Sequence, residues 1–280
     1  MRLLYLDDHG RPHLEEFLGD EIPHRYAILS HTWLQDGSEV TYNDVSTGSA
    51  KSRAGYKKIR FCGDQAARHD LKYFWVDTCC IDKSSSAELQ ETINSMFRYY
   101  RNAARCYVYL SDVSVNSYDL NGRSYQISWE SAFRRSKWFS RGWTLQELLA
   151  PQSVEFFSKQ GNRLGDKKSL ELQIHEVTGI SILALQGASL SQFSILERFS
   201  WAQYRETTRK EDWAYSLLGI FDISMPLIYG EGREKAILRL RKEISEASKG
   251  KNEWIPVRWW PNSTHILLAS CSISESLLQI

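Results

Sequence analysis

One acidic residue of the chain, Glu147, stands where a catalytic carboxylate would be expected. It lies in residues 143–148 (WTLQEL), four residues after Trp143, at the start of an apolar helix that ends before Pro151. The elements before it predict a small parallel sheet, and a carboxylate beside the carboxyl ends of such strands can act on a bound nucleotide. Another interpretation stays open, because Thr144 and Glu147 also have the spacing of a capping box, in which the carboxylate only satisfies the helix terminus.

Three further candidates, Ser30, His31 and Trp33, come at the end of a short apolar strand, Tyr26–Ser30. Open α/β sheets bind their ligands just beyond the carboxyl ends of strands, so these residues are candidates for substrate binding. A tryptophan there could stack on the flat ring of a nucleotide, and His31 could contact a ribose or a phosphate. The alternative is structural: a loop histidine beside a tryptophan that anchors the loop.

Asp77 and Asp82 lie at or after the next apolar segment and are also candidates for substrate binding. Asp82 precedes a capped helix, a position where an aspartate commonly starts a turn. Trp143 could pack in the core or form a wall of the pocket beside Glu147.

A thiol mechanism is a second class of chemistry that the residue types allow. Cys79 and Cys80 would supply the nucleophile and His31 the base. Cysteines on a buried strand are usually inert, and the spacing does not show whether the thiols meet the histidine.

The elements that must position these residues predict an α/β fold, a flavodoxin-like three-layer sandwich with a parallel sheet. A capping box at Ser85 and Glu88 begins the second connecting helix. Helical connections of more than a dozen residues are the crossovers that parallel strands need. The predicted strands are Tyr26–Ser30, Tyr73–Ile81, Cys106–Leu110 and Val154–Phe157, with helices over residues 56–68 and 86–100 and an N-terminal hairpin over residues 2–18.

The strand pattern fades near residue 165, which predicts three parts. Residues 1–164 form the α/β core with its hairpin, residues 165–245 form a helical extension, and residues 246–280 are an unassigned tail. In the extension, Thr208 and Glu211 have capping-box spacing for a short helix that Gly219 would end.

Composition excludes several classes of function. The 280 residues carry a formal net charge of +1 and are 42% apolar and 25% charged, which is ordinary for a globular protein without a field for nucleic acid. No apolar stretch approaches the roughly 18 residues of a membrane span, and the acidic N-terminus does not resemble a signal peptide, so a cytoplasmic location is expected. Five cysteines without a Cys-x-x-Cys pair favour neither disulfides nor a metal site.

Several motifs together resemble the fungal heterokaryon-incompatibility (HET) domain, and they cover most of residues 1–245. They are YAILSHTW (26–33), FWVDTCCID (74–82), ELQETINSMF (88–97), RGWTLQELLAP (141–151), TRKEDWAYSLLGIF (208–221) and MPLIYGEG (225–232). The resemblance implies a role in self/non-self recognition and programmed cell death. It also implies an upstream sensor protein as a partner, with this chain as the effector module.

A more distant resemblance, to Toll/interleukin-receptor (TIR) domains, bears on mechanism. Residues 143–148 are similar to the Trp-Cys-x-x-Glu-Leu helix of those domains, with Thr144 in place of the cysteine. In TIR enzymes that cleave NAD the glutamate of this helix is catalytic, so the resemblance implies that Glu147 is the catalytic residue and that NAD or a related nucleotide is the substrate. No further cofactor is expected. The competing hypothesis is a signalling adaptor that forms a homo-oligomer on activation and has no chemistry.

Overall fold

A seven-stranded mixed sheet organises the protein, for which a computed structural model describes residues 1–34, 37–115 and 124–248. The strands lie in the order β2-β1-β4-β3-β5-β6-β7. Their bounds are β1 (Arg2–Leu6), β2 (Pro12–Glu16), β3 (Tyr26–His31), β4 (Tyr73–Trp75), β5 (Arg105–Tyr109), β6 (Val154–Phe157) and β7 (Arg163–Asp166).

The four middle strands β4, β3, β5 and β6 are mutually parallel, and the pairs at both edges are antiparallel. If the four parallel strands are numbered along the chain, their order across the sheet is 2-1-3-4. This is the start of the flavodoxin arrangement, in which the strand order reverses beside the first parallel strand. Here that strand is β3, which pairs with β4 on one side and with β5 on the other. The predicted α/β fold with a parallel sheet is therefore confirmed, and the switch point lies at the carboxyl end of β3.

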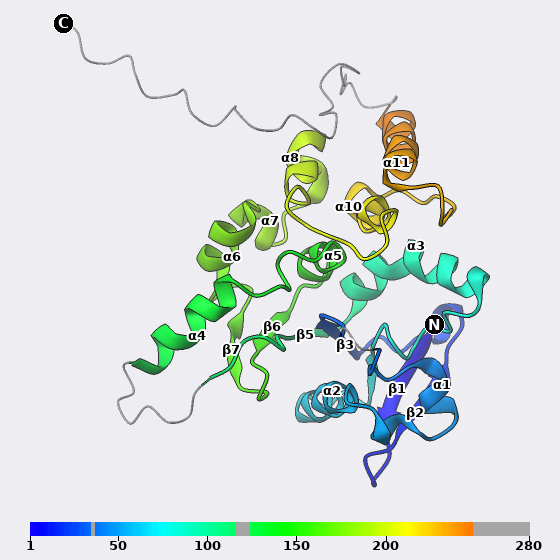
Figure 1. Ribbon diagram of the computed structural model, residues 1–280, viewed down its shortest axis with the longest axis vertical. Helices are drawn as coiled ribbons and strands as arrows, with labels where there is room; N and C mark the ends of the chain where they lie inside the picture. The colour runs from blue at the N-terminus through cyan, green and yellow to red at the C-terminus, as the bar shows by residue number, and fades with distance from the viewer. Residues whose placement is uncertain (35–36, 116–123, 249–280) are drawn as a thin grey trace, which may run out of the picture.

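Helices cover both faces of this sheet (Figure 1). α2 contacts β3, β4 and β5 on one face, while α5 contacts β3 and α3 from the other, and α10 packs outside α3. The helices are α1 (Tyr42–Ser46), α2 (Tyr56–Arg68), α3 (Ser86–Asn102), α4 (Ser124–Arg134), α5 (Thr144–Leu149), α6 (Glu171–Thr178), α7 (Ile182–Leu185), α8 (Ile195–Ser200), α9 (Asp212–Tyr215), α10 (Leu218–Phe221) and α11 (Arg233–Ser248). Three short 3₁₀ helices are η1 (Gly19–Glu21), η2 (Ala50–Ser52) and η3 (Leu190–Gln192).

The predicted strand Tyr73–Ile81 is wrong beyond Trp75. The chain turns at Val76, whose carbonyl accepts hydrogen bonds from the amides of Cys79 and Cys80. Residues 79–81 are nonetheless buried. An unbroken apolar run reports burial on all sides, and a buried turn closed by its own backbone hydrogen bonds satisfies that pattern as well as a strand does.

The helical extension differs from the prediction at its glycine. Gly219 does not end a helix but lies inside α10, where a Cβ atom would come within 2.1 Å of the Cβ of Phe97. The glycine is thus required for close packing of α10 against α3. β7 was not predicted, and it continues the sheet across the boundary set at residue 164. The division into core and extension stays a prediction, and all of the predicted tail beyond Ser248 lies outside the described residues.

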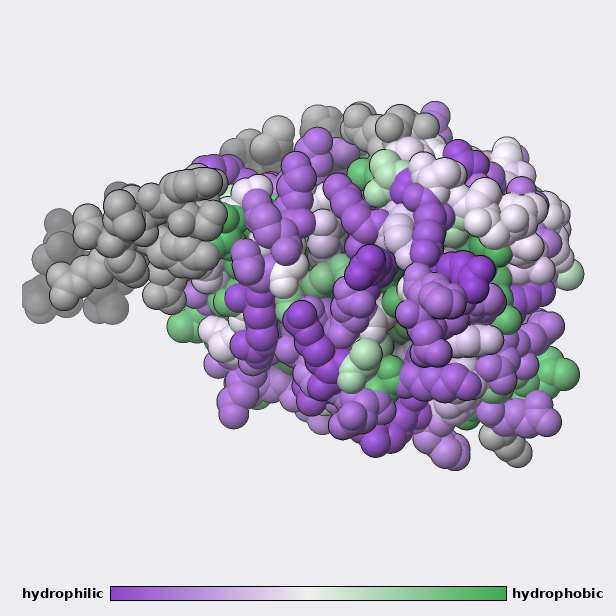
Figure 2. All heavy atoms as spheres, turned by 90° about the horizontal axis from the view of Figure 1, so that it is seen from below, coloured by the Kyte–Doolittle hydropathy of each residue, from purple (hydrophilic) through white to green (hydrophobic). Residues whose placement is uncertain are grey.

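The face over the β1–β2 hairpin and α2 is mostly hydrophilic (Figure 2). α2 exposes Lys57, Arg60 and Asp64 there while it buries Ile59 and Cys62 against the sheet. Among the described residues, no helix has the length and apolarity to cross a bilayer.

Candidate functional site

Two consecutive residues at the end of β3, Ser30 and His31, define the candidate site. Both side chains are buried. Successive side chains of a strand point to opposite faces, so Ser30 projects toward the layer of α3 and α5 and His31 toward the layer of α2. Each residue belongs to a separate hydrogen-bonded cluster: that of Ser30 contains one carboxylate, Glu147, and that of His31 contains two, Asp77 and Glu39.

The Ser30 cluster holds Glu147. The Ser30 hydroxyl donates to Oε2 of Glu147 at 2.5 Å and accepts a hydrogen bond from Nε1 of Trp138 at 2.7 Å. Glu147 is only 4% exposed. The hydroxyl of Thr144 donates to the carbonyl of Trp138 at 2.6 Å, which ties the start of α5 to the same tryptophan. The predicted approach of Glu147 to the end of the first parallel strand is therefore present in the structure.

The capping-box interpretation of Glu147 is wrong. Trp143 occupies the N-cap position of α5 and makes no side-chain capping hydrogen bond. Thr144 lies inside the helix, and its hydroxyl donates to carbonyls of the preceding turn rather than accepting from the amide of Glu147. The carboxylate is free of the helix terminus and reaches the core side chain Ser30 instead.

Burial controls the protonation of Glu147. Loss of solvent raises its pKa to about 8, although hydrogen bonds from Ser30 and Tyr100 and the positive charge of Arg141 oppose the rise. The negative charge of Asp77 adds to the rise. In this conformation Glu147 is a neutral acid at pH 7.

The His31 cluster holds the second carboxylate, Asp77. Nε2 of His31 donates to Oδ1 of Asp77 at 3.0 Å, and Nε1 of Trp33 donates to Oδ2 at 2.8 Å. The ammonium of Lys58 lies 3.2 Å from Nδ1 of His31 and also donates to the Thr32 carbonyl at 2.8 Å. Because Lys58 has only donors, Nδ1 accepts and the ring proton resides on Nε2.

Lys58 completes the cluster with an ion pair to Glu39. Its side chain is fully buried, and its three partners match the three protons of an ammonium. Burial lowers the pKa of Lys58, and the hydrogen bond and charge of Glu39 oppose this. Gly55 allows the close approach of α2, since a Cβ there would lie 2.5 Å from Oε2 of Glu39.

Asp77 titrates in the opposite direction from Glu147. Burial alone would raise the pKa of Asp77, but the hydrogen bond from His31 and the positive charges of Lys83 and Arg141 hold it well below its usual range. Asp77 is therefore ionised at neutral pH. Glu147 and Asp77 thus contact opposite faces of β3, through Ser30 and His31, and differ in charge.

Two cations lie over the ring of Trp33, which is 41% exposed. Nζ of Lys83 is 3.8 Å and Cζ of Arg141 is 5.1 Å from its centroid. Arg141 also lowers the pKa of both Asp77 and Glu147, so its guanidinium is close enough to act on both clusters. Lys83, Arg141 and Trp33 thus form the partly exposed edge of the candidate site.

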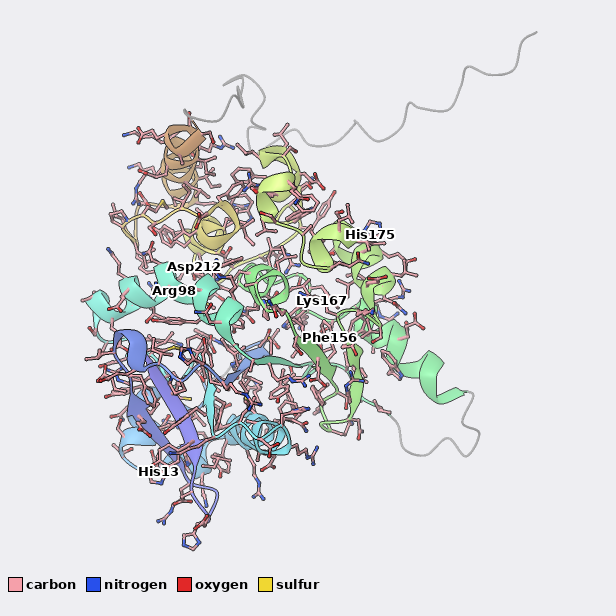
Figure 3. The ribbon with its side chains drawn as sticks, turned by 180° about the vertical axis from the view of Figure 1, so that it is seen from behind. His13, Arg98, Phe156, Lys167, His175 and Asp212 are labelled. Atoms are coloured by element: carbon pink, nitrogen blue, oxygen red, sulfur yellow. The ribbon has the colours of Figure 1, made fainter. Side chains whose placement is uncertain are left out.

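Two predicted binding residues lie apart from these clusters. The carboxylate of Asp82 accepts from the amide and hydroxyl of Ser84, the geometry of a turn before α3. Nε1 of Trp143 donates to Asp212 on α9 at 3.2 Å (Figure 3 labels Asp212), so its indole nitrogen points to the helical layer and not to Glu147.

The thiol alternative lacks its geometry. Cys79 and Cys80 are buried, and burial raises the pKa of Cys79 well above its usual value. Sγ of Cys80 accepts from the amide of Val76 at 3.3 Å, while both ring nitrogens of His31 are engaged by Asp77 and Lys58. Within the described ranges, no group of three His, Cys, Asp or Glu side chains is placed to hold a metal ion.

Sequence reasoning missed Lys58, Glu39, Trp138, Lys83 and Arg141. Lys58 alone had a usable signal, because it precedes Cys62 by four residues and therefore falls on the buried stripe of a predicted helix. The other four come from loops or turns whose paths depend on tertiary packing.

The residues at these strand ends lie in a segment that matches a known protein family. Residues 26–126 match the family model "Heterokaryon incompatibility protein (HET)". The chain carries a HET domain, which confirms the resemblance found in the sequence. It is 59% identical over 248 residues to vegetative incompatibility protein HET-E-1 of Podospora anserina, a match that covers 88% of this chain and 18% of that relative. The chain thus spans less than a fifth of the relative's length, and no solved structure matches it.

Proposed function

We propose that this HET domain is an effector of self/non-self recognition and cell death that hydrolyses NAD to nicotinamide and ADP-ribose, with Glu147 as the catalytic carboxylate. The family match and the name of the relative support the incompatibility role. The observation that carries the enzymatic proposal is the position of Glu147, a single buried carboxylate on Ser30 at the switch point of the sheet.

The chemistry needs one ionised carboxylate. The bond between C1′ of the ribose and the nicotinamide nitrogen breaks, its electron pair neutralises the pyridinium, and an oxocarbenium-like centre forms at C1′. Glu147 stabilises that positive charge and orients water, which adds to C1′ and releases a proton to solvent. Lys83 and Arg141, which lie over Trp33, are suited to hold the diphosphate.

Access to Glu147 requires a conformational change. The carboxylate is 4% exposed, protonated at pH 7, and lines neither of the two cavities that the structure describes beside α10 and beside β2. Movement of Arg141 and Trp33 would admit water and substrate, and hydration would bring the pKa of Glu147 down toward its ordinary value. Activation by a sensor or by assembly would thus open Glu147 to substrate and ionise its carboxylate.

The test compares nicotinamide release from NAD by the wild-type chain and by Glu147→Gln, each alone and brought together by an inducible dimerisation tag. Loss of the carboxylate should lower the rate by about 10²-fold or more. Glu91→Gln, which removes an exposed carboxylate on α3, is the matched control. Equal rates for wild type and Glu147→Gln would refute the enzymatic proposal. If Glu147→Gln stays active and Cys80→Ala loses activity, the thiol mechanism would be favoured.

A non-enzymatic adaptor is the second candidate, because the helical extension exposes large apolar side chains. Leu172, Leu183, Leu196 and Tyr204 are each more than half exposed. The five tryptophans described after residue 124 add little to this surface, since Trp129, Trp138 and Trp201 are buried and Trp143 and Trp213 are half-buried. Exposed apolar patches serve association. Cell death that persists in Glu147→Gln but is lost in Leu183→Asp would favour the adaptor.

A further inference from the structure

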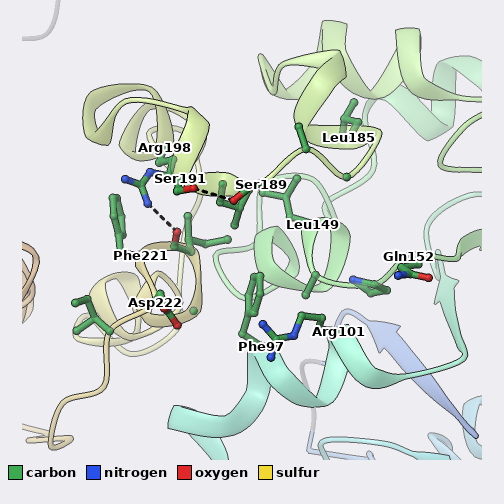
Figure 4. Close-up of a pocket in the computed structure, with 18 of the residues that line it drawn as sticks. Phe97, Arg101, Leu149, Gln152, Leu185, Ser189, Ser191, Arg198, Phe221 and Asp222 are labelled. Atoms are coloured by element: carbon green, nitrogen blue, oxygen red, sulfur yellow. Dashed lines mark hydrogen bonds between the residues drawn. The ribbon is translucent and has the colours of Figure 1, made fainter. Parts of the chain in front are cut away.

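A cavity of about 900 Å³ lies away from the two carboxylate clusters (Figure 4). It opens between α3, the end of α5, the segment before α8, α10 and the end of α11. Neither Ser30, His31, Asp77 nor Glu147 lines it. Its volume is in the range of pockets that bury a small organic ligand.

The charges of the lining favour an anion. Arg101, Lys167 and Arg198 line the cavity, against one acidic side chain, Asp222. Arg101 makes no hydrogen bond or ion pair with any residue of the described ranges, and Figure 4 shows its guanidinium beside Phe97. Lys167 is fixed on the carbonyls of Leu148 and Pro151, so its charge is held at the cavity wall.

The apolar side chains of the lining favour an aliphatic body over a nucleotide base. Leu149, Leu185 and Leu190 contribute aliphatic surface. The ring of Phe221 already has the guanidinium of Arg198 over it at 4.7 Å, and the ring of Phe199 lies 4.5 Å from it. A flat base therefore finds no free face on Phe221, and the guanidinium of Arg101 lies beside the ring of Phe97, the other aromatic side chain of the lining, whereas an alkyl chain needs only apolar contact.

We propose that this cavity binds an amphipathic organic anion, an acyl chain whose carboxylate or phosphate head is held by Arg101 with Arg198 and Lys167 nearby. This site is separate from the proposed NAD site, and neither proposal depends on the other.

The test uses the full 280-residue chain and displacement of a fluorescent dansyl-labelled undecanoate. Laurate and dodecyl phosphate should displace the probe. Dodecanol, which has the same chain without charge, should be weaker by about tenfold or more, as expected for loss of a charge-assisted hydrogen bond. ADP-ribose should not displace the probe. No saturable binding, equal potency of laurate and dodecanol, or displacement by ADP-ribose would each overturn the proposal.

Two arginines of α3 provide matched variants. Arg101→Gln should weaken laurate about tenfold and leave dodecanol unchanged, whereas Arg98→Gln, which lies outside the cavity lining and bonds Ser95, should change neither. Ser189→Trp should fill the rim and weaken both ligands. Circular dichroism checks that each variant is folded. Similar effects of Arg98→Gln and Arg101→Gln would contradict a specific site, and if Arg101→Gln fails to fold, the comparison of laurate with dodecanol on wild type decides.

Discussion

The two sides of β3 hold a carboxylate in opposite ways, with Glu147 buried and Asp77 half-buried. Beyond Ser30, Glu147 is buried, and the loss of solvent raises its pKa to about 8. Beyond His31, Asp77 receives two N–H donors and lies near the cations Lys83 and Arg141, and its pKa falls. Paired acids whose environments separate their pKa values commonly have different roles. Asp77 is suited to fixing the geometry of His31 and Trp33, and Glu147 to chemistry that begins when its surroundings change.

The largest expected effect is on the charged side. Lys58→Met removes the cation and leaves Glu39 buried without its ion pair, so the free energy of unfolding should fall by about 3–5 kcal/mol. Urea denaturation measures it. Lys57→Met, an exposed neighbour on α2, should change it by less than about 0.5 kcal/mol. Adding Glu39→Gln to Lys58→Met should recover part of the loss. If Lys58→Met lowers the free energy of unfolding no more than Lys57→Met does, the His31 side of β3 does not depend on the buried ion pair.

The next effect is a change in pH dependence on the neutral side. The folded protein holds the Glu147 proton more tightly than the unfolded chain, whose glutamate has a pKa near 4.5. The stability from this group is therefore complete below about pH 4.5 and is lost as pH rises toward 8, with a loss on the order of 3 kcal/mol already at pH 7. Glu147→Gln, which cannot ionise, should remove that part of the decline in urea denaturation between pH 5 and 9. An unchanged pH profile in Glu147→Gln, with Glu91→Gln as control, would show that Glu147 is not held neutral.

Only part of the site around β3 could be predicted from the sequence. The strand Tyr26–Ser30, observed as β3, and the helix α3 were predicted because apolar runs and a capping serine are local signals. The meeting of Ser30 with Glu147 followed from the parallel order of elements. The protonation of Glu147 could not be predicted, because it depends first on burial and then on Ser30, Asp77, Arg141 and Tyr100, which are distant in sequence from Glu147 or come from other elements.

The loop around Asp77 shows the other limit of sequence analysis. Residues 76–81 are as apolar as a strand, yet they turn so that the carboxylate faces His31 and Trp33. Whether a buried run is extended or folded back depends on which of its backbone groups find partners, and a single sequence does not contain that information.

The smallest expected effect tests the Asp77 side at its exposed edge. Trp33→Phe keeps an aromatic ring for Lys83 but removes the N–H donor to Asp77, so the pKa of Asp77 should rise toward its ordinary value. An acid with a lowered pKa contributes stability above the pKa of the unfolded chain, so the variant should be weaker by about 0.5–1 kcal/mol at pH 7. Urea denaturation at pH 7 measures this cost, and the carboxyl 13C shift of Asp77 followed by NMR measures its pKa. A cost in stability without a rise in the pKa of Asp77 would mean that Trp33 contributes through packing alone, and that His31 and the cations suffice to keep Asp77 ionised.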